Sequence, residues 1–127
     1  MNLSHLLQAP PAPSPALPAW LATACQEIEK QENFSLGTEQ FCELAGRSAP
    51  HVARAVRRHL GQTPTDLVNA ARLKYAASKL ATSDESILDI ALDCGLENLG
   101  HFYKLFRGQF SASPRQYRVA QQQIVRP

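Results

Sequence analysis

Residues 46–67 read GRSAPHVARAVRRHLGQTPTDL, and residues 95–117 read GLENLGHFYKLFRGQFSASPRQY. Each stretch opens with a glycine, continues with apolar residues at helical spacing and basic residues between them, and closes on Thr-Pro or Ser-Pro. An offset of 49 residues pairs Gly46 with Gly95, and after one extra residue in the second turn an offset of 50 pairs His51 with His101 and Pro64 with Pro114. Because helical apolar spacing alone would not also pair the turn, the basic residues and the caps, we interpret the two stretches as an internal repeat.

Each repeat predicts a short helix, a turn with glycine and a longer helix with a basic outer face, which are the parts of a helix-turn-helix. In the first repeat we expect a helix over residues 38–45 and a helix that Ser48 caps and that ends at Leu60. In the second we expect a helix over residues 87–94 and a helix that begins at the cap Asn98. The residues expected to face inward are Phe41, Cys42, Leu44, Val52, Ala55, Val56, Leu60, Ile87, Ile90, Ala91, Cys94, Phe102, Leu105, Phe106 and Phe110.

A long helix is expected between the repeats. Thr63, Pro64 and Asp66 give it a capping threonine, a proline at the first helical position and a carboxylate three residues after the cap. Over residues 63–82 such a helix would be about 30 Å long, close to the roughly 34 Å between successive major-groove faces of DNA. Its expected inward residues are Leu67, Ala70, Leu73, Ala76, Ala77 and Leu80.

The remaining segments complete an all-α chain of about seven helices. A first helix is expected from about Pro18 to Gln31, because Trp20, Ala24 and Ile28 recur at helical spacing, and a seventh opens at Ser113-Pro114. The first 18 residues hold five of the nine prolines, which is typical of a tail or interdomain linker. The expected division is therefore 1–18 as the tail and 19–127 as one domain, made of a first helix-turn-helix unit (19–62), a linker helix (63–82) and a second unit (83–127).

Composition and charge narrow the class of function. With 44% hydrophobic and 19% charged residues, the sequence is typical of a globular chain and has no long apolar run that would span a membrane. Residues 1–46 contain one lysine against five glutamates, a formal charge of −4, whereas residues 47–127 contain 12 basic against 6 acidic residues, a formal charge of +6. This segregation favours a polyanionic partner. The alternative is that the charges only solvate two helix faces.

The second repeat resembles the C-terminal signature of the AraC/XylS family of bacterial transcription regulators, and the resemblance covers roughly residues 38–118. It implies two helix-turn-helix units that flank one linker helix and place both recognition helices in successive major grooves on one side of the duplex. The sequence departs from the family pattern at Gly108, where a basic residue is usual, and at Ser111, where glycine is usual. The matching residues are Asp89-Ile90-Ala91, Cys94-Gly95-Leu96, His101-Phe102, Leu105-Phe106-Arg107, Phe110, Ser113-Pro114 and Tyr117-Arg118, together with Gly61, Thr63-Pro64, Arg72-Leu73, Ala76 and Leu80.

The same resemblance implies the residues that contact DNA. Arg54 has the donors to bind a guanine edge in a bidentate manner, and Lys104 is its partner in the second repeat. Two roles are open for Arg115 and Arg118: contact with DNA or hydrogen bonding to helix ends. The expected base contacts are Pro50, Ala53, Arg54, Leu99, Gly100, Tyr103 and Lys104, and the expected phosphate contacts are Ser48, His51, Arg57, Arg58, Thr63, Asn98, His101, Arg107 and Ser113.

We therefore predict a sequence-specific transcription regulator that binds double-stranded DNA, and more specifically the DNA-binding part of a longer, ligand-responsive protein. RNA polymerase is a further candidate partner. Without a signal-peptide pattern, the expected location is the cytoplasm, at the nucleoid. We expect no enzyme activity, cofactor, metal site, small-molecule site or membrane contact in this chain. The alternatives are a stand-alone activator controlled by its abundance, a thiol sensor that uses Cys25, Cys42 or Cys94, and a helical interaction module.

Overall fold

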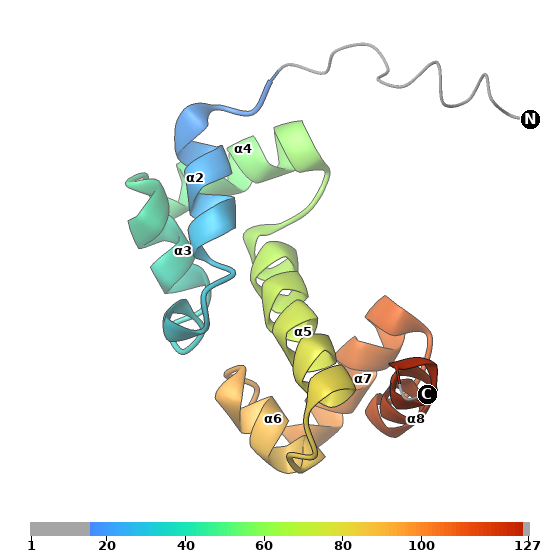
Figure 1. Ribbon diagram of the computed structural model, residues 1–127. Coiled ribbons are helices and arrows are strands. Elements are labelled where there is room, and N and C mark those ends of the chain that lie inside the picture. The colour runs from blue at the N-terminus through green and yellow to red at the C-terminus, as the bar shows by residue number, and fades with distance from the viewer. Residues whose placement is uncertain (1–15, 126–127) are drawn as a thin grey trace, which may run out of the picture.

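The computed structural model describes residues 16–125, and within them it contains helices and no strands. Two helix-turn-helix units lie at the two ends of one long helix, as expected (Figure 1). We call α2–α4 the first unit, α5 the linker helix and α6–α8 the second unit. Residues 1–15 of the expected proline-rich tail lie outside the described residues. The elements are α2 (Ala19–Glu27), the 3₁₀ helix η1 (Gln31–Asn33), α3 (Thr38–Ala45), α4 (Ala49–Leu60), α5 (Pro64–Thr82), α6 (Ile87–Asp93), α7 (Leu99–Phe110) and α8 (Pro114–Val125).

Side-chain caps determine where the later helices begin. The Thr63 hydroxyl accepts a hydrogen bond from the Asp66 N–H (3.1 Å), while the Asp66 carboxylate accepts one from the Thr63 N–H (3.0 Å). Ser113 and Gln116 form the equivalent pair of hydrogen bonds before α8, at 3.1 and 3.0 Å. Each reciprocal pair satisfies two donors that a helix start leaves free. The predicted starts of α5 and α8 are thus confirmed.

The predicted end of the first helix was wrong. We expected it to continue to Gln31, but α2 ends at Glu27 and a turn of 3₁₀ helix follows. The Asn33 side-chain amide donates a hydrogen bond to the Glu27 carbonyl oxygen (2.6 Å) and so satisfies the end of α2. Phe34, directly after Asn33, is buried in the core. This tertiary contact folds the chain back before another helical turn can form.

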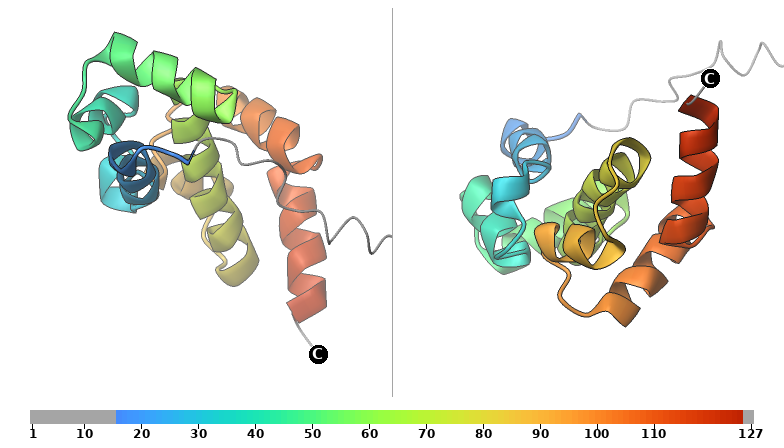
Figure 2. Two further views of the ribbon diagram at one scale, coloured as in Figure 1. Left: turned by 90° about the horizontal axis from the view of Figure 1, so that it is seen from above. Right: turned by 60° about the horizontal axis from the view of Figure 1, so that its bottom comes forward.

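The linker helix buries more of its surface than a single stripe. Leu73, Ala76, Ala77 and Leu80 are buried as predicted. Leu67 and Ala70, which we expected to face inward, are only half-buried, and the neighbouring Val68 and Ala71 are buried instead. The reason is that α5 packs against α3, α4, α6, α7 and α8, so that its core-facing side is wide. Figure 2 shows the first unit on one side of α5 and α8 on the other.

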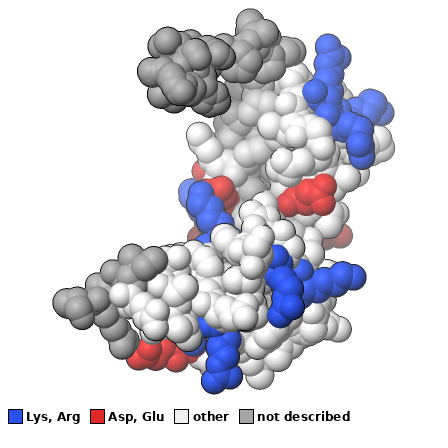
Figure 3. Space-filling model, turned by 90° about the vertical axis from the view of Figure 1, so that its right-hand side faces the viewer, with Lys and Arg blue, Asp and Glu red and all other residues white. Residues whose placement is uncertain are grey.

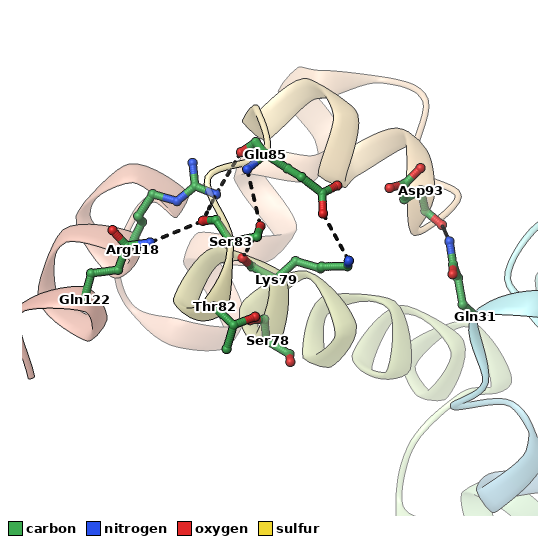
Figure 4. A network of polar contacts seen from close by, with 9 residues as sticks. All are labelled: Gln31, Ser78, Lys79, Thr82, Ser83, Glu85, Asp93, Arg118 and Gln122. Carbon is green, nitrogen blue, oxygen red and sulfur yellow. Dashed lines mark hydrogen bonds and ion pairs between the residues drawn. The ribbon is translucent and has the colours of Figure 1, made fainter. Parts of the chain in front are cut away.

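Helix α8 fastens the second unit to the end of the linker helix. The Arg118 guanidinium donates hydrogen bonds to the carbonyl oxygens of Leu80 (3.2 Å), Ser83 (3.0 Å) and Glu85 (2.8 Å). The Gln122 amide also donates to the Leu80 and Ser83 carbonyls, each at 3.2 Å. Figure 4 shows Arg118 and Gln122 beside Ser83 and Glu85. A basic side chain at these free carbonyls stabilises the helix end. Of the two roles that the sequence left open for Arg118, the structure supports hydrogen bonding to a helix end.

Among the described residues, no helix is both long and apolar enough to cross a membrane.

Candidate nucleic-acid interface

Helix α4 separates an apolar side from a basic side. Its core side carries Val52 and Val56, neither of which has exposed surface. The hydroxyl of Ser48 caps the helix by accepting a hydrogen bond from the His51 N–H (3.3 Å). The expected contact residues of its outer side are all exposed, namely Pro50, Ala53, Arg54, Arg57 and Arg58.

Helix α7 repeats this arrangement in the second unit. Phe102 and Phe106 are fully buried, and the Asn98 side-chain oxygen caps the helix by accepting a hydrogen bond from the His101 N–H (2.8 Å). Tyr103 differs from the other expected contacts because it is half-buried, with its ring edge-on to Phe102 at a centroid distance of 6.2 Å. The exposed residues among the expected contacts are Asn98, Leu99, Gly100, His101, Lys104 and Arg107.

The basic side chains of α4 and α7 have no acidic partner among residues 16–125. The ion pairs there join Lys30 to Glu27, Lys74 to Glu29 and Lys79 to Glu85, all outside these two helices. On the face seen in Figure 3, separate groups of basic side chains lie over the upper and lower parts of the molecule, with an acidic patch between them. Unpaired cations on both units leave their charge available to a polyanion.

The helix starts offer fewer free amides than the sequence suggested. The Thr63 and Ser113 N–H groups, expected near phosphates, already donate to the side chains of Asp66 and Gln116. The next residue in each case is a proline, which has no N–H. The backbone donor that remains at each start, among the contacts of the described residues, belongs to the second helical residue, Thr65 in α5 and Arg115 in α8. Thr63 and Ser113 themselves are half-buried.

Trp20 joins α2 to the start of the recognition helix α4. It is half-buried and packs edge-on against His51, with ring centroids 5.5 Å apart. The Arg47 guanidinium carbon lies 4.9 Å from the Trp20 ring centroid, within the range of a cation–π contact. Sequence reasoning missed this contact because residues 20 and 51 are far apart in the chain.

The cysteines have environments that suppress thiol chemistry. Cys94 is fully buried, its thiol donates to the Ala91 carbonyl (3.4 Å), and burial raises its pKa to about 11. Burial also raises the pKa of the half-buried Cys25 and Cys42. Because the thiolate is the reactive form, raised pKa values weigh against the thiol-sensor alternative. In the described part of the chain, no three His, Cys, Asp or Glu side chains are grouped as metal ligands would be.

Comparison with known proteins identifies the family. A family model described as a helix-turn-helix domain matches residues 41–120. The fold is similar to the crystal structure of a regulator with an AraC-type DNA-binding domain from Chromobacterium violaceum, with a TM-score of 0.73 and 28% identity over 83% of this chain and 94% of that chain. The chain belongs to the AraC-type helix-turn-helix family. That family consists of transcription regulators rather than enzymes.

Other AraC-type proteins support the same assignment. The chain is 45% identical over 80 residues to the HTH-type transcriptional activator RhaS of Enterobacter sp. (strain 638), which covers 63% of this chain and 29% of RhaS. It is also similar to the DNA-binding domain of the global transcriptional factor AdpA, solved in complex with a target DNA, with a TM-score of 0.65 and 28% identity over 87% of this chain and 96% of that one. The chain spans about a third of the length of the curated relatives it matches, 33% and 29% for two of them.

Proposed function

We propose that this chain is the sequence-specific DNA-binding part of a longer AraC-type transcription regulator, with α4 and α7 as recognition helices in neighbouring major grooves. The observation that carries the proposal is that both helices present exposed basic side chains without acidic partners among the described residues. Such cations neutralise phosphates and release counterions, which supplies much of the affinity for DNA.

The linker helix supports simultaneous contact with two grooves. α5 has 19 residues, which corresponds to a length of about 28 Å at 1.5 Å per residue. Successive major-groove faces lie about 34 Å apart. A stiff helix of this length between the two units allows one monomer to contact two half-sites.

In this proposal the first two turns of each recognition helix read the bases. Arg54 and Lys104 supply the donors that bind guanine O6 and N7. The small or apolar residues around them allow close approach and contact with thymine methyl groups, and the Tyr103 hydroxyl adds a further donor from its half-buried ring. In this proposal the apolar contacts are Pro50, Ala53, Leu99 and Gly100.

Phosphate contacts orient the domain on the duplex. Arg57 and Arg107 lie one helical turn beyond the base-reading residues, where the backbone of the duplex would pass. The free amides of Thr65 and Arg115 are better donors than Thr63 and Ser113, whose N–H groups are already bonded. The start of α8 favours phosphate more than that of α5, since Gln116 is neutral and Asp66 is acidic. Ser48, His51, Arg58, Asn98 and His101 complete the proposed phosphate surface.

The remaining parts of the proposal concern the longer protein. Because the chain covers about a third of its curated relatives, 33% and 29% for two of them, we infer that the full regulator adds a ligand-responsive region. We also propose RNA polymerase as a second partner and the cytoplasm, at the nucleoid, as the location. The stand-alone activator remains the alternative arrangement.

Selection of binding sites from a random duplex pool tests the function directly. We expect enrichment of one bipartite site, and a slope of log K against log salt of about −5 if about six phosphates are neutralised. Lys104→Ala should weaken binding, whereas Lys30→Ala should not, because Lys30 pairs with Glu27 away from α4 and α7. Failure to enrich any duplex, or affinity independent of salt, would contradict the proposal.

A further inference from the structure

Arg72 extends from the linker helix to the first unit. Its side chain is half-buried, and its Nη2 donates a hydrogen bond to the carbonyl oxygen of Phe34, in the segment between η1 and α3. The same guanidinium faces Gly37, where a Cβ would lie 3.2 Å from Nη2. The backbone of Gly37 has φ +60°, so this position favours glycine on two counts. Arg72 thus holds the loop of the first unit that precedes α3.

The same guanidinium also touches the second unit. A Cβ on Gly95, in the turn between α6 and α7, would lie 3.3 Å from both Nε and Nη2 of Arg72, and 3.0 Å from the Phe34 carbonyl oxygen. The turn therefore packs directly on the guanidinium and on the loop of the first unit. Gly95 has φ +85°, and only glycine combines this conformation with such close approach.

A second contact joins the two units at this junction. The Gln31 side-chain amide, in the first unit, donates a hydrogen bond to the carbonyl oxygen of Asp93 at the end of α6 (3.2 Å) (Figure 4). Asp93 comes two residues before Gly95, which lies in the turn that packs on Arg72. The first and second units therefore touch each other directly here, in addition to their separate packing on α5.

The electrostatic surroundings of Arg72 indicate a role in positioning rather than in ion pairing. Burial lowers the pKa of its guanidinium, and no carboxylate of the described residues pairs with it. Its buried Nε has no hydrogen-bond partner among the described residues. Burying a charge without an acidic partner costs free energy that an apolar side chain of similar volume would not incur. The rigid, planar guanidinium instead lies close to two loops at once.

We propose that Arg72 is a positioning residue that sets the angle between the two units and thereby the half-site spacing that the domain accepts. This inference rests on the proposed function, because it concerns how two recognition helices are held relative to each other. Arg72 touches no DNA in this role. It acts by joining the loop at Phe34 and Gly37 to the turn at Gly95.

The orientation of the units can be measured without DNA, by residual dipolar couplings of the free domain. In the parent protein, one alignment tensor should fit the amides of both units. In Arg72→Met each unit should still fit a tensor of its own, but the two tensors should differ. Arg72→Lys keeps the charge without the planar fork and should behave like Arg72→Met. Lys74→Met removes an equal charge two residues along the same helix and should match the parent, because among residues 16–125 Lys74 pairs with Glu29 of the first unit and not with the second unit.

A milder variant covers the case in which Arg72→Met does not fold. Gln31→Ala removes an exposed hydrogen bond across the same junction and should give a smaller divergence of the two tensors. One shared tensor in both Arg72→Lys and Gln31→Ala, equal to that of the parent, would overturn the proposal.

The second measurement uses the selected duplex and copies of it with one or two base pairs inserted between the half-sites. In the parent, the affinity for the selected site should exceed that for the respaced site. In Arg72→Met the ratio of these two affinities should fall by about threefold or more, a change typical of residues that couple two sites without touching either ligand. Affinity for a single half-site should stay at the parent value. An unchanged ratio in Arg72→Met would overturn the proposal. If the parent binds no duplex, the proposed function fails, while the dipolar couplings still decide the role of Arg72 in orientation.

Discussion

Ser48 and Asn98 lie fifty positions apart and cap the two recognition helices in the same way. The side-chain oxygen of each accepts a hydrogen bond from the backbone N–H three residues later, at 3.3 Å for His51 and 2.8 Å for His101. Each cap fixes the start of its helix, and the proposed base contacts lie in the first two turns after it. The repeat therefore preserves the means of placing a recognition helix as well as its basic residues.

Removing either cap should lower both stability and affinity. We expect Ser48→Ala and Asn98→Ala each to cost about 1 kcal/mol of unfolding free energy, because an N-terminal donor is left unsatisfied. Ser86→Ala is the matched control, since Ser86 caps α6 through the Asp89 N–H (3.0 Å) away from α4 and α7. Chemical denaturation and duplex titration should show a stability loss in all three variants and weaker DNA binding only in the first two. Equal effects of all three on DNA binding would contradict this.

Arg54 and Arg57 should affect binding in different ways. Arg54→Ala should cost about 1–3 kcal/mol on the preferred site and relax the choice of base at one position, as loss of a bidentate base contact does. Arg57→Ala should weaken binding to all duplexes alike and reduce the salt slope by about one. Site selection repeated with each variant measures both effects. If the two variants select the same set of sites, our assignment of their roles is wrong.

The family departures at Gly108 and Ser111 should both be correctable. Gly108 lies on the exposed side of α7 with open space around its missing Cβ, so Gly108→Ala should stabilise the domain by about 1 kcal/mol. Ser111 has φ 58° and is the non-glycine residue with positive φ among residues 16–125, so Ser111→Gly should also be stabilising.

Gly61 offers the reciprocal control for Ser111. It ends α4 with φ 67° at the position that matches Ser111 in the repeat. Gly61→Ser should therefore destabilise the domain by roughly 1 kcal/mol, the cost of a left-handed conformation in a residue with a Cβ. Thermal or denaturant unfolding measures all three changes, and a gain of stability in Gly61→Ser would refute the argument.

Cys94 should be the slowest thiol to react and should make stability fall at high pH. Its pKa is raised from 9.0 to about 11 by burial, so folding favours the neutral thiol. The corresponding stability is complete below pH 9 and is lost as the pH rises through 11. Alkylation of the native protein should spare Cys94 while the half-buried Cys25 and Cys42 react. The decline in unfolding free energy between pH 9 and 11 should be shallower in Cys94→Ala; an identical slope would be evidence against the mechanism.

Local signals allowed the sequence to predict where helices begin. The caps Ser48, Thr63, Asn98 and Ser113 all precede helices in the structure, because capping depends on residues within one turn of the start. The repeat also allowed the exposed faces of α4 and α7 to be predicted, since their buried sides follow from spacing alone. Which exposed residues bind base or phosphate stays a prediction.

Contacts between residues far apart in the sequence could not be predicted from local sequence signals. Nothing near Asn33 in the sequence shows that its side chain will end α2 at Glu27. Arg72 and Arg118 act on segments more than thirty residues away, Phe34 and Leu80 respectively. The shift of burial within α5 from Leu67 and Ala70 to Val68 and Ala71 has a similar origin, because several helices rather than one surround it.

Trp20 gives this domain its own optical probe. It is the single tryptophan of the chain, and its ring lies against His51 and beneath the Arg47 guanidinium, at the start of α4. Indole emission responds to changes in the charged and aromatic groups that surround the ring. Excited selectively, the tryptophan fluorescence of the unlabelled protein therefore reports on one recognition helix and not on the other, so that engagement of the first unit can be followed in real time without a signal from Tyr103 of α7.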